Sequence, residues 1–174
     1  MIGMDLKAVQ GQFLDRKKVL RRVSKSKIKP LIKQGAYVRR TAKKSIAKPR
    51  MKTVGEMTPD ERRSYERRVV ANKLAGLPRP KRPLASSRPG DPPRSQTGTL
   101  KKFLFFSFDS RTESVVVGPA RIRSDDPNAP STLEFGGSAT IRGQRRTIAP
   151  RPYMGPALAE EQPNFAALWR NSIR

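Results

Sequence analysis

Residues 97–119 read TGTLKKFLFFSFDSRTESVVVGP and contain two apolar runs separated by a short polar segment. The first run lies within residues 99–108 and is rich in phenylalanine and leucine, and the second is Ser-Val-Val-Val-Gly at 114–118. Aromatic and β-branched residues favour strands, and the polar residues 109–113 favour a turn. The stretch therefore predicts an antiparallel hairpin.

Downstream of this hairpin, the sequence predicts two more strands and a helix. The strands are expected at residues 131–142 and 145–149, around a turn near Gly143. Pro156 is expected to open a C-terminal helix, which Pro163 kinks or splits. The predicted apolar face of that helix consists of Phe165, Leu168, Trp169 and Ile173.

Upstream of the hairpin, apolar residues recur at helical spacing in two basic segments. A short helix is predicted over residues 12–27, with Asp15 near its start, where the helix dipole favours an acid. A longer helix is predicted over residues 29–48, with Pro30 in its first turn. Gly35 weakens this second prediction, because glycine is a poor helix former.

The segment between the basic helices and the hairpin has a strong local signal followed by a proline-rich stretch. Thr58-Pro59-Asp60-Glu61 has the pattern of a capping box with proline at the first helical position, which predicts a helix ending near Leu74. Residues 78–95 are rich in proline and arginine, which predicts an extended basic arm. Such an arm is either a disordered linker or a segment that orders across a neighbouring chain.

These elements divide the chain into three parts and indicate an α+β fold. The parts are a basic helical region (1–57), a helix with the Pro-rich arm (58–95), and a β-rich domain with the C-terminal helix (96–174). We expect a small antiparallel sheet of four or more strands, packed against a long N-terminal helix and the C-terminal helix. The helix and Pro-rich arm of the middle part form an insertion.

The charge of the chain is large and uneven. There are 38 Lys and Arg against 14 Asp and Glu, a formal net charge of +24. Residues 1–95 hold 27 of the basic and 7 of the acidic side chains. A chain this basic is expected beside nucleic acid, an acidic protein surface or an anionic membrane. The candidate contacts are Arg39, Arg40, Lys43, Lys44, Arg62, Arg63, Arg67 and Arg68. Because there is no sequence-reading module, any nucleic-acid contact is expected to be with the backbone.

The composition argues against an enzyme and against a membrane protein. Cysteine and histidine are absent, so the sequence lacks disulfides, the usual zinc ligands, a thiol nucleophile and a histidine base. Glu134 is a lone carboxylate in a predicted strand, for which we expect a salt bridge to an arginine or a contact with another subunit. Asp125 and Asp126 lie in a polar loop without the spacing of a metal site. No apolar run approaches the about 18 residues that span a bilayer. We therefore expect no catalysis, no cofactor and no membrane partner.

Four short blocks in the second half carry a family resemblance. They are Thr97-Gly98-Thr99-Leu100-Lys101, Val115-Val116-Val117-Gly118-Pro119, Leu133-Glu134-Phe135-Gly136-Gly137, and Ala149-Pro150-Arg151-Pro152-Tyr153-Met154-Gly155-Pro156-Ala157-Leu158. In this order they resemble the tail-completion, or head–tail joining, proteins of long-tailed bacteriophages. The match covers residues 96–174, and residues 49–95 depart from the family plan. The block positions to which the resemblance gives a structural role are Thr97, Gly98, Leu100, Gly118, Pro119, Glu134, Phe135, Gly136, Arg151, Pro152, Tyr153 and Pro156.

The resemblance implies a structural virion protein located in the neck, at the top of the tail. Such a protein would form a homo-oligomeric ring, a hexamer or dodecamer, between a portal or adaptor and a tail-terminator or tail-tube protein. Genomic DNA would pass through the ring, so the basic helices would face either DNA or acidic protein surfaces. Packing of the last helix on the sheet is expected to involve Phe135, Tyr153, Met154, Leu158 and Trp169. The alternative is a basic nucleic-acid-binding protein of ribosomal or nucleoid type.

Overall fold

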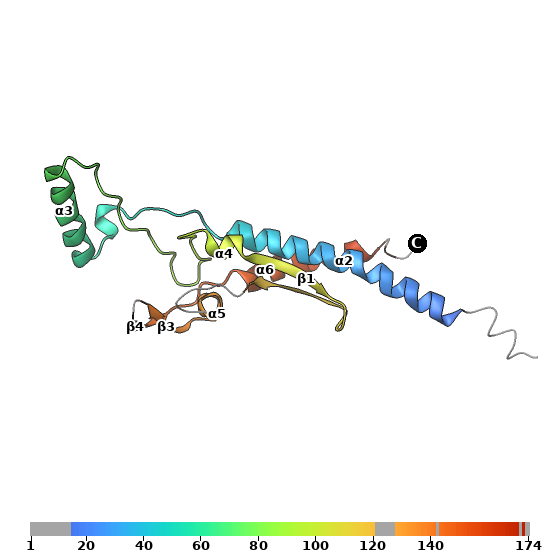
Figure 1. Ribbon diagram of the computed structural model, residues 1–174. Coiled ribbons are helices and arrows are strands. Elements are labelled where there is room, and N and C mark those ends of the chain that lie inside the picture. Colours follow the sequence, from blue (N-terminus) through green and yellow to red (C-terminus); the bar gives the residue numbers. More distant parts are fainter. Residues whose placement is uncertain (1–14, 121–127, 142, 171, 173–174) are drawn as a thin grey trace, which may run out of the picture.

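The computed structural model describes residues 15–120, 128–141, 143–170 and 172. Its longest element is helix α2 (Arg16–Ser45), which at 1.5 Å per residue spans about 45 Å. The Asp15 side chain accepts a hydrogen bond from the Lys18 amide at 3.0 Å, as expected for an acid at a helix start. Figure 1 shows α2 running along an elongated molecule, with helix α3 (Pro59–Leu74) standing apart beyond its C-terminal end.

The prediction of two separate basic helices was wrong, because α2 is continuous through Pro30. A proline inside a helix removes an amide donor and crowds the carbonyl four residues earlier, but Pro30 is itself buried, and this packing offsets the cost. The predicted end at residue 48 was also late, since Ile46 is already extended. Residues 12–14 of the first predicted helix lie outside the described residues.

The hairpin predicted from residues 97–119 is confirmed. Strands β1 (Leu104–Asp109) and β2 (Ser114–Pro119) pair antiparallel, from Leu104 opposite Pro119 to Asp109 opposite Ser114. Residues 99–102, which were predicted as part of the first strand, instead form one helical turn, α4 (Thr99–Lys102). Gly98 precedes this turn with a φ of +81°, a conformation that glycine adopts without a steric penalty.

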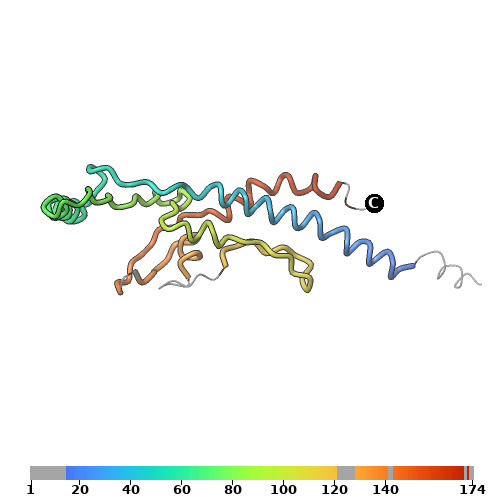
Figure 2. Tube along the Cα trace, turned by 45° about the horizontal axis from the view of Figure 1, so that its top comes forward, coloured from blue at the N-terminus to red at the C-terminus, as the bar shows by residue number. Residues whose placement is uncertain are grey.

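Helix α2 lies across one face of the β1–β2 hairpin (Figures 1 and 2). Gly35 is buried at the crossing, where a Cβ atom would come within 2.4 Å of Val115 Cγ1 and 3.1 Å of Phe106 Cδ2. The glycine that weakened the helix prediction is therefore the residue that lets helix and hairpin approach closely.

A second hairpin follows, and it differs from the prediction in two ways. Strands β3 (Gly137–Ile141) and β4 (Gln144–Ile148) pair only with each other, so the described residues contain two two-stranded sheets rather than one sheet of four strands. Residues 131–135, which were predicted as strand, belong to helix α5 (Ala129–Phe135). Periodicity does not separate a helix from a strand in so short an apolar run, and here a proline in the first turn favours the helix.

The C-terminal helical segment is split in the region of Pro163, as predicted. It consists of α6 (Met154–Glu161), the 3-10 turn η2 (Gln162–Asn164) and α7 (Phe165–Trp169). Both α6 and α7 pack against α2, and the Thr41 hydroxyl hydrogen-bonds the Glu161 carboxylate between them. Ile173 of the predicted apolar face lies outside the described residues.

The core lies where α2, the first hairpin and α6 meet. Its buried members are Val38, Ala42, Ile46, Leu104, Tyr153 and Ala157. Met154 and Phe165 pack against this core from the C-terminal segment. Phe135, however, is 81% exposed, so its predicted role in packing was wrong, whereas Leu158 and Trp169 are only partly covered at 48% and 36% exposed. The fold as a whole is α+β, with a small antiparallel sheet against a long N-terminal helix and a C-terminal helix.

The segment of residues 49–95, which contains the predicted insertion, leaves the core and returns to it (Figure 1). It carries the 3-10 turn η1 (Val54–Glu56) and helix α3 (Pro59–Leu74), whose predicted capping box between Thr58 and Glu61 is present. The outgoing and returning segments are hydrogen-bonded to each other, from the Lys52 amide to the Pro83 carbonyl at 2.8 Å and from the Ala85 amide to the Arg50 carbonyl at 2.7 Å. The Pro-rich arm is therefore extended, as predicted, and it is paired with a segment of its own chain.

Candidate functional site

The third and fourth sequence blocks meet in a joint around Glu134. Its carboxylate accepts hydrogen bonds from the backbone amides of Tyr153 at 2.8 Å, Met154 at 3.0 Å and Gly155 at 2.8 Å. These amides begin helix α6, whose first N–H groups have no partner within the helix. Glu134 therefore caps α6 from another element, and it makes no salt bridge to an arginine among the described residues, contrary to one of the two expectations for it.

Backbone contacts fix the same joint from both sides. The Arg151 amide donates to the Leu133 carbonyl at 2.6 Å, so the two blocks also pair directly. Gly136 has a φ of +77°, and a Cβ atom there would lie 3.2 Å from the Ile148 carbonyl oxygen. Only glycine fits this position without strain, because an L side chain rarely adopts that conformation. Gly136 thus ends α5 and turns the chain into β3.

Tyr153 is the buried centre of the fourth block. It is 1% exposed, and burial, together with the charge of Glu134, raises the pKa of Tyr153 to about 12. Arg151 is half-buried and donates to the carbonyls of Ser87 and Ala149, so it ties the Pro-rich arm to the block. Pro152 is half-buried before the helix, whereas Pro156 lies exposed within α6 rather than at its start.

The first two blocks frame the other hairpin. Pro119 pairs with Leu104 at the open end of β1–β2, and a Cβ atom at Gly118 would meet no other atom within 4 Å. Leu100 packs against the core from α4, and the Thr97 hydroxyl hydrogen-bonds that of Thr99 at 2.7 Å. The first two blocks therefore flank the β1–β2 hairpin, and the third and fourth form the joint at the start of α6.

A cleft of about 850 Å³ separates the Pro-rich arm from the blocks. Its lining includes Gly98 and Leu100 of the first block, Leu133 of the third and Arg151 of the fourth. Within the part of the chain that the structure describes, no group of three or more acidic, histidine or cysteine side chains is placed to hold a metal ion. Nor does any helix there have the length and apolar character needed to cross a membrane.

The basic candidates on α2 do not form one surface. Arg39 is half-buried and donates from Nε to the Leu104 carbonyl at 2.7 Å, with its guanidinium 6.0 Å from the centre of the Phe105 ring. Lys43 is half-buried beside it, and burial, Arg39 and Lys101 together lower the pKa of Lys43. Arg40 and Lys44 lie on the exposed side of the helix. The structure therefore assigns two of the four to packing and leaves two open to a partner.

The basic candidates on α3 lie at the far end of the molecule from the start of α2 (Figures 1 and 2). Arg62 pairs with Glu66 at 3.0 Å, and Arg63 approaches Asp60 at 4.0 Å. Arg67 and Arg68 are exposed and have no ion pair among the described residues. Acidic neighbours thus partly neutralise this group of arginines.

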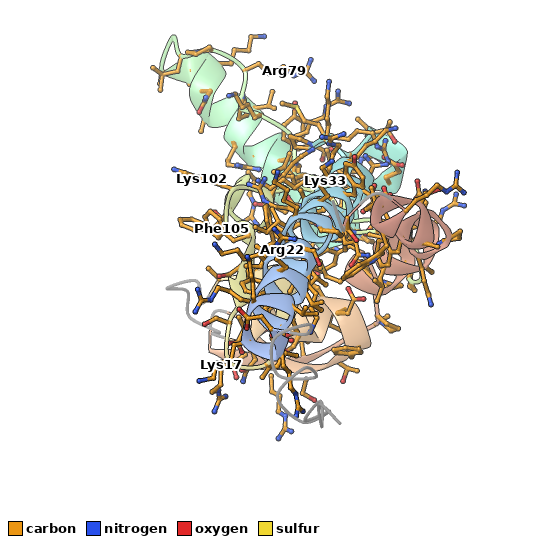
Figure 3. All side chains as sticks on the ribbon, turned by 90° about the vertical axis from the view of Figure 1, so that its right-hand side faces the viewer. Lys17, Arg22, Lys33, Arg79, Lys102 and Phe105 are labelled. Atoms are coloured by element: carbon orange, nitrogen blue, oxygen red, sulfur yellow. The ribbon has the colours of Figure 1, made fainter. Side chains whose placement is uncertain are left out.

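The sequence reading missed a longer row of cations on the outer side of α2. We call it the basic stripe, and its members are Lys18, Arg22, Lys25, Lys29, Lys33, Arg40 and Lys44. All seven side chains are exposed, and successive members are three, four or seven residues apart, which is the spacing of one helix face. Figure 3 places Arg22 and Lys33 on α2, with Arg79 apart from them. The spacing of these basic residues could have revealed the stripe from the sequence, if one helix had been assumed to continue through Pro30.

No protein-family model, no curated protein and no solved structure matches this chain.

Proposed function

We propose that this chain is a structural, non-enzymatic component of a bacteriophage neck that joins the head to the tail. The observation that carries the proposal is the joint around Glu134, where three backbone amides of one sequence block converge on the carboxylate of another. The third and fourth of the blocks that resemble head–tail joining proteins are thereby joined through the backbone, and the first two flank the β1–β2 hairpin. A framework role explains why these residues occur together without any catalytic group.

In this proposal the subunits assemble into a ring of identical chains, a hexamer or a dodecamer, around the DNA channel. A ring needs heterologous contacts, in which one surface of a subunit meets a different surface of the next. The unpaired edges of the two hairpins offer backbone groups for such contacts. The proposed neighbours are a portal or adaptor on one side and a tail-terminator or tail-tube protein on the other.

The test is electron microscopy of particles made when the gene carries an early stop codon. We expect DNA-filled heads beside separate, finished tails, and we expect joined particles to return when the intact gene is supplied from a plasmid. A Glu134→Gln gene supplied in the same way should restore joining poorly if the joint supports assembly. Intact, infectious virions from the stop-codon strain would rule out the neck role.

The basic stripe favours a second candidate, a nucleic-acid-binding protein of ribosomal or nucleoid type. Native mass spectrometry of the purified chain separates the two. A closed ring of subunits supports the neck role. A monomer that binds RNA tightly at physiological salt supports the second candidate.

A further inference from the structure

The basic stripe combines three properties that are not found together elsewhere among the described residues. Its seven cations are all exposed, and none of them makes an ion pair with a described residue. Helix α2 itself contains no acidic residue between Arg16 and Ser45. The stripe is therefore a row of positive charge that no acidic side chain among the described residues neutralises.

The fold holds this row straight and turned outward. The opposite side of α2 is fixed to the core by Gly35, Val38 and Ala42, so the stripe faces solvent along the whole packed half of the helix. Lys27 pairs with Glu113 in the turn of the first hairpin at 2.7 Å. Figure 1 shows the N-terminal part of α2 running on beyond the hairpin.

The length of the stripe matches a nucleic-acid duplex. From Lys18 to Lys44 the helix rises about 39 Å, because each residue adds 1.5 Å. One turn of double-stranded DNA is about 34–36 Å long and presents a phosphate every 3.4 Å on each strand. A straight row of this length spans one duplex turn and can meet the phosphates that both strands present on that side of the duplex.

The composition of the basic stripe favours a nucleic-acid duplex over an acidic protein surface as its partner. The stripe has five lysines and two arginines, and the centres of protein–protein interfaces are depleted in lysine and contain apolar anchors. Phosphate contacts, in contrast, use lysine and arginine alike and carry no sequence information. We infer that the basic stripe of α2 binds the phosphate backbone of double-stranded DNA lengthwise, without sequence preference.

The inference stands on the stripe and does not require the neck role. It is tested on the purified, full-length chain with a fluorescently labelled duplex of about 20 base pairs, a length that covers more than one turn. Anisotropy gives the dissociation constant between about 50 and 200 mM salt. For seven phosphate contacts we expect a slope of log K against log salt of about −6, and an affinity loss over that range of several thousandfold.

The decisive variant removes four stripe charges, as Lys18→Gln, Arg22→Gln, Lys29→Gln and Lys33→Gln together. Glutamine is a good helix former, so α2 should persist, which circular dichroism checks. We expect the slope to become less negative by about 3.6, because each lost phosphate contact removes about 0.9. A second variant changes the remaining positions, as K25Q, R40Q and K44Q together, and its slope should become less negative by about 2.7. This variant tests the stripe if the four-charge variant loses its helix.

The matched control neutralises Arg62, Arg63, Arg67 and Arg68 of α3 to glutamine, which lowers the net charge by the same four units. Its slope should stay within about one unit of the unmodified chain's. Equal losses in the stripe and α3 variants would mean that binding follows net charge, and an unchanged slope in both stripe variants would exclude the stripe. Either result overturns the inference.

Two further measurements test whether the partner is DNA and whether binding is independent of the DNA sequence. Polyglutamate of the same total charge should displace the duplex poorly, and efficient displacement would favour an acidic protein as the partner. Duplexes of different sequence should bind within about twofold of each other, since phosphates are common to all of them. These measurements concern the isolated chain, so their failure would leave the particle-assembly test of the neck role unaffected.

Discussion

Glu134 shows how much of this fold depends on one carboxylate. A glutamine there has nearly the same size but only one acceptor oxygen, and it would place an amide N–H group against donors of α6. Hydrogen bonds to charged groups contribute about 1.5–3 kcal/mol each, and part of this strength remains with a neutral acceptor. We expect Glu134→Gln to lower the free energy of unfolding by about 2 kcal/mol, measured by urea denaturation.

The control for this change is Glu160→Gln, on the exposed side of the same helix. It removes one negative charge from α6 without touching the joint, so its effect should stay within about 0.5 kcal/mol. Equal effects of the two variants would mean that the joint contributes no more than surface charge.

Gly35 is the second residue whose side chain, or lack of one, determines the packing. An alanine Cβ would lie 2.4 Å from Val115 Cγ1, so helix and hairpin would have to separate. Overpacking costs about 1–3 kcal/mol, and the better helix propensity of alanine offsets up to about 1 kcal/mol of it. We therefore expect Gly35→Ala to be destabilising by about 1 kcal/mol in urea denaturation.

A double-mutant cycle identifies the cause of that loss. Val115→Ala removes the atom that the new Cβ would meet, so the double variant should be less destabilised than the sum of the single variants by about 1 kcal/mol. Strict additivity would place the effect of Gly35→Ala elsewhere.

At the scale of elements, the outer end of the insertion is held by ion pairs that respond to acid. Arg50 hydrogen-bonds both oxygens of Glu56, and this contact, followed by the Thr53 amide, lowers the pKa of Glu56 from 4.5 to about 2. A depressed carboxyl pKa stabilises the fold above the ordinary value, and this contribution is lost as the pH falls from 4.5 towards 2. We expect the turn at residues 53–56 to loosen in that range.

Nuclear magnetic resonance measures this directly, through the Thr53 amide that donates to Glu56 at 2.8 Å. Its chemical shift should titrate with a midpoint near 2 in the unmodified chain. In Arg50→Gln the midpoint should move up towards 4.5, because the largest cause of the shift is removed. A midpoint that does not move would mean that the arginine does not set this pKa.

The elements that the sequence predicted are those with local signals. The capping box of Thr58 and Glu61 and the hairpin of residues 104–119 each depend on neighbouring residues, and both are confirmed. The helical conformation of residues 131–135 was missed, because a short apolar run suits either structure and its context comes from residues 149–155. Separating two helices at Pro30 was wrong for the same reason, since packing decided whether the helix continued.

The candidate site was likewise predictable only where the signal is local in the sequence. Charge counts identified α2 as basic, but which cations are free depends on the hairpin that covers Arg39 and Lys43. The partner of Glu134 lies 19 to 21 residues away in the chain, beyond the reach of spacing rules. A signal was present even so, because a helix starting at Met154 has no capping side chain of its own.

For the molecule as a whole, the core and the insertion are separate structures. No residue between 49 and 95 belongs to the core cluster, and α3 lies far from it in both views (Figures 1 and 2). Met51 and Leu84 face each other in an antiparallel bridge, so an Asn-Gly turn can join them. We expect a chain in which Asn-Gly replaces residues 52–83 to fold, with an unfolding midpoint close to that of the full chain.

The fluorescence of the single tryptophan, Trp169 in α7, follows this transition, because α7 packs on α2 and not on the insertion. The shortened chain also keeps the whole basic stripe, so its salt slope with DNA should equal that of the full chain. Loss of cooperative unfolding would show that the insertion supports the core after all.

The paired arms also have a consequence for how the gene can change over generations. The chain leaves the core and returns to it at neighbouring points. A single insertion or deletion event can therefore add or remove the residues between Met51 and Leu84 without shifting any other element. The insertion is therefore free to diverge at its own pace, and descendants of one ancestral chain can differ in it completely while sharing the same joint around Glu134.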